Sequence, residues 1–265
     1  MKNNISNNTR RNLIRLVMAC LVLVMVLCAV RLYRNYRQAE QARLDAERWA
    51  SLAAETTEET TPAETPEETE PETEPPYVSP VNFEELSKIN PEIVGWLTIP
   101  GTKVDYPIVQ TTDNETYLHK SFDGQDSKAG TIFLDSDSSS DFTGRNNIIY
   151  GHHMRDGSMF KDVVKFKEKD YFDDHRDAYI YTPDRTIHLR LISAYYGDAD
   201  PQKRRTQFDT QEAFDEYVQK VVSPCSYAQL PESPVDTIYT LITCSYEFDN
   251  ARTFLYGVEV QEEAE

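Results

Sequence analysis

Apolar positions are concentrated near the N-terminus, where residues 13–33 carry arginines only at the margins of the run, Arg15 and Arg31. A helix of about 20 residues spans a bilayer core of about 30 Å, and marginal arginines can extend to the headgroups. A cleavable signal peptide is the alternative, because basic residues precede the run, but no small-x-small cleavage site follows it. The pattern therefore predicts a tail over residues 1–12 and an uncleaved transmembrane anchor over residues 13–33.

The polar pattern changes twice before the folded region begins. Residues 34–55 mix Ala, Glu, Arg and Leu, and this composition predicts a juxtamembrane helix that continues the anchor. Residues 56–79 are dominated by Thr, Glu and Pro, and such a segment buries too little apolar surface to offset its ordering entropy. We therefore predict a solvated spacer there, and we expect none of the first 76 residues to pack on the folded domain.

From residue 80 to residue 262 the apolar pattern is that of a folded domain. Asn82 predicts the start of a helix, because apolar positions recur at helical spacing over residues 83–89. Pro91 predicts a second short helical turn, which ends at Gly95.

Most later apolar runs are short and rich in β-branched and aromatic residues, with Asp, Ser, Gly and Asn clusters between them, which is typical of strands. These runs are residues 104–109, 146–150, 187–195, 237–244 and 253–260. Residues 209–222 instead have helical spacing, and Asp209 and Glu212 predict the start of that helix. The pattern predicts a mostly β fold with N-terminal helices and one late helix.

Composition and motifs argue against nucleic-acid binding and against a metal or cofactor site. The formal net charge of −18 argues against nucleic acid as a partner, because a phosphate backbone requires a basic face. Part of this acidity is local, since residues 55–74 contain nine Glu and neither Lys nor Arg. The sequence has no phosphate-binding loop and no calcium loop, and its four cysteines lack the spacing of a zinc site. We therefore expect no cofactor and no metal.

The cysteines have different sequence contexts. Cys20 and Cys28 lie in the predicted anchor, which leaves Cys225 and Cys244 as the one pair that a disulfide could join. An exported protein can hold such a bridge, but a free thiol outside the cell favours catalysis. We expect Cys225, beside Pro224, to be structural.

Three reactive side chains stand at the ends of predicted strands. Cys244 ends the run Thr-Leu-Ile-Thr-Cys, Arg252 precedes the next run, and His152 follows a Tyr-Gly pair after a third run. Nucleophilic acyl transfer uses this set, because a thiol attacks, an imidazole moves protons and a cation stabilises the oxyanion. Since successive strand residues point to opposite faces, we expect only one of His152 and His153 to face the thiol.

These motifs resemble the signature of sortases, the membrane-anchored cysteine transpeptidases of Gram-positive bacteria. Four further segments are similar to class B sortases, namely residues 83–86, 89–102, 105–110 and 130–135. The resemblance implies the sortase fold, an eight-stranded β-barrel with N-terminal helices and an inserted late helix. It places the catalytic domain over residues 80–262.

For the site, the resemblance implies that Cys244 is the nucleophile and that Arg252 is the cation. It makes His152 the proton carrier, because the family motif has the imidazole directly after the Gly. A Cys-His-Asp triad that includes Asp135 or Asp105 is the less favoured alternative.

The resemblance further implies that the enzyme cleaves a C-terminal sorting signal of the Asn-Pro-x-Thr-x kind after Thr, through a thioacyl intermediate. Its partners would be surface proteins that bear this signal and an amine acceptor, either a peptidoglycan cross-bridge precursor or a pilin lysine. It also implies a cytoplasmic tail and an extracellular catalytic domain at the cell membrane, whereas basic residues on both sides of the anchor leave the orientation open.

Two alternatives to a transpeptidase remain open at this stage. A tethered cysteine peptidase would hydrolyse the same intermediate, and a non-catalytic wall-binding module would keep the barrel without using the thiol. Ile242 and Ser245 also depart from the residues that are frequent in class B relatives, so recognition of the sorting signal can differ.

Overall fold

The computed structural model of the chain describes residues 7–54, 77–245 and 247–260. The chain falls into two compact units, Met1–Ala42 and Arg43–Glu265. The predicted spacer over residues 56–79 lies almost entirely outside the described residues, and its role stays a prediction.

One helix, α1 (Asn7–Ala54), runs through the predicted anchor and the predicted juxtamembrane segment. Residues 16–30 contain no charged side chain, and the large apolar side chains of this stretch are exposed. Within the part of the chain that the structure describes, α1 is the one helix that is long and apolar enough to cross a membrane. The helix is therefore compatible with the predicted anchor.

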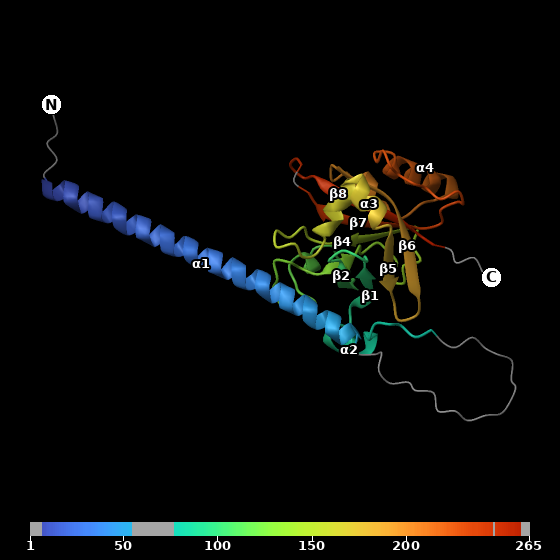
Figure 1. The fold of residues 1–265 in the computed structure, drawn as a ribbon, viewed down its shortest axis with the longest axis horizontal. Helices are drawn as coiled ribbons and strands as arrows, with labels where there is room; N and C mark the ends of the chain where they lie inside the picture. Colours follow the sequence, from blue (N-terminus) through green and yellow to red (C-terminus); the bar gives the residue numbers. More distant parts are fainter. Residues whose placement is uncertain (1–6, 55–76, 246, 261–265) are drawn as a thin grey trace, which may run out of the picture. The chain divides into compact units, whose positions relative to one another are not determined.

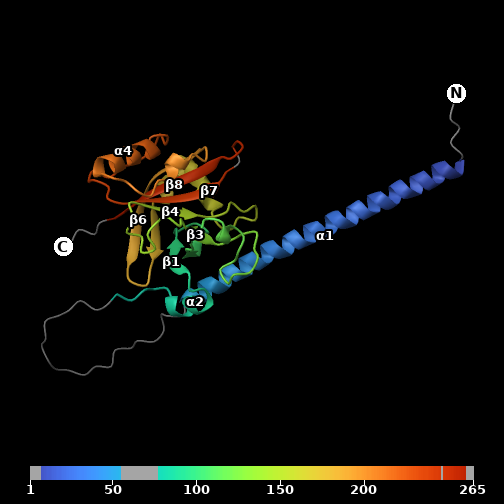
Figure 2. The ribbon, with the colours of Figure 1, turned by 180° about the vertical axis from the view of Figure 1, so that it is seen from behind.

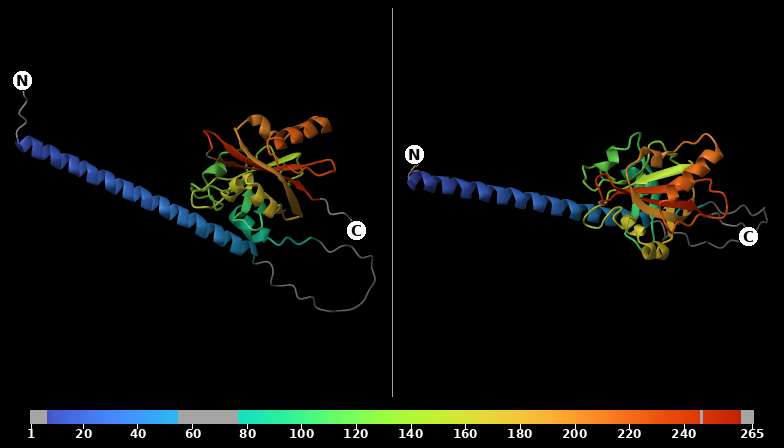
Figure 3. Two further views of the ribbon diagram at one scale, coloured as in Figure 1. Left: turned by 45° about the horizontal axis from the view of Figure 1, so that its top comes forward. Right: turned by 90° about the horizontal axis from the view of Figure 1, so that it is seen from above.

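The second unit is built on a closed barrel of eight strands, in the order β1-β2-β3-β4-β7-β8-β6-β5 (Figures 1 and 3). The strands are β1 (Ile93–Thr98), β2 (Asp105–Val109), β3 (Ile132–Leu134), β4 (Asn146–Tyr150), β5 (Asp177–Tyr181), β6 (Thr186–Gly197), β7 (Ile238–Cys244) and β8 (Arg252–Glu259). Each strand therefore has a paired neighbour on both sides, so among the described residues the sheet has no edge strand. The predicted eight-stranded barrel is confirmed.

Besides the end of α1, the helices that the described residues of this unit form are short. They are α2 (Phe83–Ile89), α3 (Lys169–Asp174), α4 (Gln211–Val222) and three 3-10 turns, η2 (Thr116–Leu118), η3 (Asp162–Lys167) and η4 (Pro201–Arg204). α2 forms where the pattern predicts it, and the Asn82 side chain caps it by accepting from the Glu85 backbone N–H at 3.1 Å. The predicted helical turn from Pro91 to Gly95 is wrong, because β1 begins at Ile93 and pairs with both β2 and β5.

The directions of β4, β7 and β8 bring three strand ends together. β4 and β7 run parallel, with Tyr150 opposite Ile242. β7 and β8 run antiparallel, with Cys244 opposite Arg252. The last residues of β4 and β7 and the first residue of β8 therefore lie at the same end of the barrel.

The late helix α4 lies on the outside of the strands (Figures 1 and 2). Its buried side chains pack against outward-facing residues of β4, β6, β7 and β8. They are Phe214, Tyr217, Val218, Val221 and Val222. The start predicted at Asp209 and Glu212 is displaced, because the Thr210 hydroxyl is the cap and accepts from the Ala213 N–H at 3.2 Å.

The last turns of α1 pack on the rest of the second unit, contrary to the expectation that no residue before 77 does so. Trp49 and Ala53 are 4% and 5% exposed, in a cluster with Leu86 and Phe122. The Trp49 ring meets the Phe122 ring edge-on, with centroids 5.4 Å apart. The Asn82 backbone N–H also donates to the Ala53 carbonyl at 3.0 Å. The end of α1 is therefore part of the second unit.

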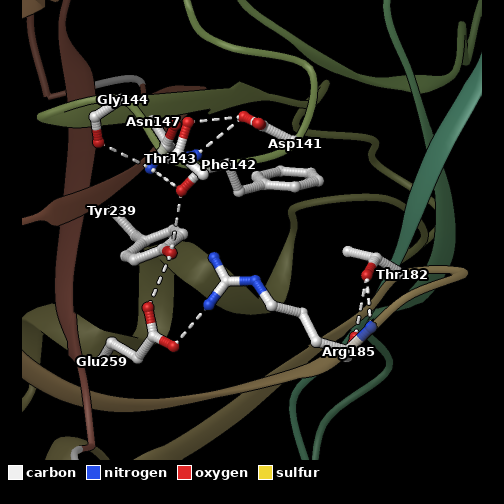
Figure 4. A network of polar contacts seen from close by, with 9 residues as sticks. All are labelled: Asp141, Phe142, Thr143, Gly144, Asn147, Thr182, Arg185, Tyr239 and Glu259. Carbon is white, nitrogen blue, oxygen red and sulfur yellow. Dashed lines mark hydrogen bonds and ion pairs between the residues drawn. The ribbon is translucent and has the colours of Figure 1, made fainter. Parts of the chain in front are cut away.

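A partly buried polar network joins the start of β7 and the end of β8 to the loop before β4 (Figure 4). Tyr239 shares its hydroxyl proton between the Phe142 carbonyl and the Glu259 carboxylate, each at 3.3 Å, and Arg185 pairs with Glu259 at 2.7 Å. Burial and the charge of Glu259 raise the pKa of Tyr239, so the hydroxyl stays protonated. Asn147 adds a bond to the same carbonyl at 3.0 Å. These contacts hold the loop before β4 against the barrel.

Candidate active site

The three predicted site residues all belong to the outer face of the barrel. Cys244, Arg252 and His152 each lie two residues from a side chain that packs in the cluster beneath α4. Those neighbours are, in the same order, Ile242, Phe254 and Tyr150. Because residues two apart along a strand share a face, β7, β8 and the end of β4 direct thiol, guanidinium and imidazole to one side.

Cys244 and Arg252 are direct cross-strand partners. Directly opposed residues in an antiparallel pair have Cβ atoms about 4.5–5.5 Å apart, so the thiol and the guanidinium are neighbours. Both residues are partly exposed and open to a substrate. The Arg252 Nη1 donates to the Ala251 carbonyl at 3.0 Å, which orients the guanidinium.

His152 lies two residues beyond the end of β4. The Gly151 N–H still donates to the Ile242 carbonyl at 3.1 Å, so His152 and Cys244 occupy equivalent positions past Tyr150 and Ile242. The His152 Nε2 lies 2.8 Å from the Leu118 carbonyl, which only accepts, so in the neutral ring Nε2 carries the proton. Nδ1 is then the atom of His152 that can take up a proton.

His153 is held differently from His152. It is 9% exposed, and its Nδ1 lies 2.9 Å from the Cys244 carbonyl while its Nε2 lies 2.7 Å from the Lys161 ammonium. Burial lowers the pKa of His153, the contact with the Cys244 carbonyl raises it, and the positive charge of Lys161 lowers it further. Both ring nitrogens are engaged, which favours His152 over His153 as the proton carrier.

Two contacts hold the described residues between β7 and β8. The Ser245 N–H donates to the Ala251 carbonyl at 3.0 Å, which extends the ladder by one bond beyond Cys244. Lys167 of η3 forms an ion pair with Glu247 in the loop. Burial opposes the charge of Glu247, but Lys167 lowers its pKa overall, so the ion pair persists near neutral pH. The loop therefore keeps Cys244 and Arg252 in register.

The two candidate triad carboxylates are engaged elsewhere. Asp135 accepts from the Tyr150 hydroxyl at 2.7 Å. Asp105 accepts from the Trp96 indole at 2.7 Å and from the Thr98 hydroxyl at 2.8 Å. These bonds support a site of Cys, His and Arg without a third acid. Within the residues that the structure describes, no group of three or more His, Cys, Asp or Glu could hold a metal ion.

The two cysteines of the domain are both free thiols, in different surroundings. Cys225 is 7% exposed and belongs to the apolar cluster beneath α4. Cys244 is partly exposed at a strand end. Only Cys244 is placed for contact with a substrate.

Sequence reasoning missed three groups around the site. The Leu118 carbonyl, Lys161 and Lys167 contact His152, His153 and the loop after β7. A backbone carbonyl leaves no signature in residue type. Two lysines in a segment that carries several others give no signal without the fold. None of the three could have been identified from the sequence alone.

Comparison with known proteins gives one consistent result. The family model of the sortase domain matches residues 97–260. Sortase B of Listeria monocytogenes is 37% identical over 166 residues, which are 62% of this chain and 68% of the relative. Sortase B of Staphylococcus aureus is 28% identical over 163 residues, or 61% of this chain and 67% of the relative.

Solved structures agree with these relatives. The sortase B of Bacillus anthracis in complex with AAEK1 has a TM-score of 0.70 at 27% identity and covers 86% of this chain and 100% of its own. Sortase B of Listeria monocytogenes has a TM-score of 0.60 at 35% identity, covering 68% of this chain and 100% of its own. Because the domain match, the relatives and the barrel agree, the chain belongs to the sortase family and is a class B, sortase-type cysteine transpeptidase.

Proposed function

We propose that this transpeptidase cleaves a C-terminal sorting signal after Thr and transfers the protein to an amine, with Cys244, His152 and Arg252 as its catalytic residues. The observation that carries the proposal is the placement of thiol, imidazole and guanidinium on adjacent strand ends of one barrel face. The family match supports the class of reaction.

In the first half-reaction, the Cys244 sulfur attacks the carbonyl carbon of the Thr, and the carbonyl electrons move to oxygen. Arg252 stabilises that oxyanion, because its guanidinium is always charged and offers several donors in a planar fork. The C–N bond then breaks, and Nδ1 of His152 delivers to the leaving amine the proton that the Cys244 thiol gave up to it on becoming the nucleophile. A thioester on Cys244 remains.

The second half-reaction reverses these roles. An incoming amine attacks the thioester carbonyl and loses a proton to Nδ1 of His152. The C–S bond breaks, Cys244 recovers the charge or the proton, and a new amide forms. The acceptor is an amine of a peptidoglycan precursor or of a pilin lysine, and both fit the same chemistry.

The substrate sequence that we propose is of the Asn-Pro-x-Thr-x kind. One residue near the nucleophile differs from that of many class B relatives. Ile242, where a Ser is frequent in class B relatives, is 4% exposed and packs in the cluster beneath α4. It offers the signal no hydroxyl, so hydrogen bonding at this position must differ from that of relatives with Ser.

Placement at the membrane completes the proposal. The apolar stretch of α1 would anchor the enzyme with its tail in the cytoplasm and its barrel outside. Substrate and enzyme would then share one surface, which raises their effective concentration.

The test uses the full chain in detergent micelles with a panel of sorting-signal peptides, including several of the form Asn-Pro-x-Thr-x. Mass spectrometry follows cleavage with and without an added amine such as triglycine. We expect a thioester on Cys244 and an amide product that replaces hydrolysis as the amine concentration rises. Hydrolysis that is unaffected by every amine offered would favour the tethered cysteine peptidase instead.

Arg252→Lys should lose at least about tenfold in turnover, or about 1.4 kcal/mol of barrier, because an ammonium cannot reproduce the planar fork. Steady-state kinetics on the best panel peptide measures the loss. Arg190→Lys, at an exposed site on β6, is the matched control and should keep wild-type turnover. Wild-type turnover in Arg252→Lys would remove Arg252 from the proposed chemistry.

A further inference from the structure

The backbone of Cys244 is supported on the β4 side by a side chain rather than by the strand. In the β4–β7 ladder the Gly151 N–H donates to the Ile242 carbonyl, and the next carbonyl on that side of β7 is that of Cys244. A continuing parallel strand would supply the N–H of residue 153. The backbone of His153 instead forms a bridge with Met159, so it has left the ladder.

The ring of His153 takes the place of that missing donor. Its Nδ1 lies 2.9 Å from the Cys244 carbonyl. The next hydrogen bond between the two chain segments is therefore present, but an imidazole N–H donates it instead of a peptide N–H. On the other side, the Ser245 N–H bond to Ala251 continues the ladder toward β8. Cys244 is thus held on both sides at the point where the chain turns into a loop.

Lys161 determines which ring nitrogen of His153 carries the proton. An ammonium only donates, so at 2.7 Å from Lys161 the Nε2 must accept. Nδ1 then carries the N–H and donates to the Cys244 carbonyl. The ring is also 9% exposed, so water competes little for this bond.

We propose that His153 is a positioning residue, whose Nδ1–H, oriented by Lys161, holds the Cys244 backbone so that the thiol meets the scissile carbonyl. The proposal rests on the proposed function, in which Cys244 is the nucleophile. Misplacement of a reacting group by about 1 Å can reduce a rate by about 100-fold. Loss of one hydrogen bond to the backbone of the nucleophile can therefore lower kcat substantially.

Two amide substitutions separate this role from general packing. Asn places its amide nitrogen where His has Nδ1, whereas Gln places it near the position of Nε2. His153→Asn in the full chain should keep kcat for peptide cleavage within about threefold of wild type. His153→Gln should lose about tenfold or more in kcat, with KM for the same peptide within about twofold.

A second pair of variants tests the orientation by Lys161. Lys161→Met should lower kcat several-fold, because the ring loses the partner that fixes its tautomer. Lys165→Met is the matched control, since Lys165 lies in the same segment but pairs with Asp162, and it should keep wild-type kinetics. If the His153 variants fold poorly, Lys161→Met and Lys165→Met still test the positioning role. Wild-type kcat in Lys161→Met would overturn the proposal.

The outcomes separate this proposal from the function on which it rests. If Cys244→Ala stays active, the proposed function fails. Suppose instead that Cys244→Ala is inactive. The positioning role alone then fails if His153→Gln has wild-type kcat, or if folded His153→Asn and His153→Gln lose the same amount of kcat. A rise in KM with unchanged kcat would show that His153 contributes to substrate binding instead, and it would also overturn the proposal.

Discussion

Replacing Cys244 by Ala should reduce cleavage and transfer to the uncatalysed background. Among the described residues at the shared end of β4, β7 and β8, this thiol is the nucleophile that has an adjacent guanidinium and an imidazole at the equivalent position of the neighbouring chain. Without the sulfur no thioester can form, so the loss affects kcat and not merely KM. Product formation from a sorting-signal peptide, measured by mass spectrometry, gives the result directly.

Cys225→Ala is the matched control for this experiment. Its side chain is buried in the cluster beneath α4, so its loss removes one sulfur from the packing and leaves the catalytic face intact. We expect most activity to remain. A thioester found on Cys225, or a Cys244→Ala variant that still transfers peptide, would contradict the assignment.

Removal of the N-terminal 76 residues should destabilise the barrel, whereas removal of the first 42 should not. The longer deletion removes Trp49 and Ala53 and exposes the side chains of Leu86 and Phe122 that they cover. Loss of a buried Trp side chain typically costs about 3–5 kcal/mol, which is a large part of a domain stability of about 5–15 kcal/mol. Urea unfolding followed by circular dichroism compares the two truncated proteins.

Trp49→Ala in the 43–265 protein isolates the contact from the effect of chain length. It should reproduce most of the loss that the longer deletion causes. Arg43→Ala is the control, because this side chain lies in an exposed ion pair with Glu47, and such pairs contribute little. Equal unfolding midpoints for all of these proteins would mean that the α1 contact adds nothing to stability.

The sequence predicted the strands of the candidate site better than the rest of the fold. Asn146–Tyr150 is β4 as predicted, and the runs that end at Cys244 and begin near Arg252 became β7 and β8 with boundaries shifted by one residue. β-branched runs bounded by polar turns give a strong local signal. The short separation of Cys244 and Arg252 predicted that their two strands are neighbours, whereas the pairing of β4 with β7 leaves no local pattern in the sequence.

The errors have physical causes outside local sequence. β1 begins at Ile93 instead of a helical turn, because ladders with β2 and β5 outweigh the local preference after Pro91. Trp49 was assigned to a segment without packing, because one aromatic among charged helix-forming residues makes no apolar stripe. The proton-bearing nitrogens of His152 and His153 depend on a carbonyl and an ammonium that only the fold brings near.

The packed end of α1 also determines what a cut in the chain between residues 55 and 76 would do. Ala53 and Asn82 are hydrogen-bonded across the segment that separates them in sequence, and Trp49 is buried beside them. A protease that cut between residues 55 and 76 would break the chain without breaking these contacts. The barrel should then still co-purify with the helix under native conditions and separate from it only in denaturant. Separation of the barrel from the helix would therefore require both a cut in the chain and loss of the packing of Trp49 and Ala53. These contacts would hold the two fragments together without a covalent bond.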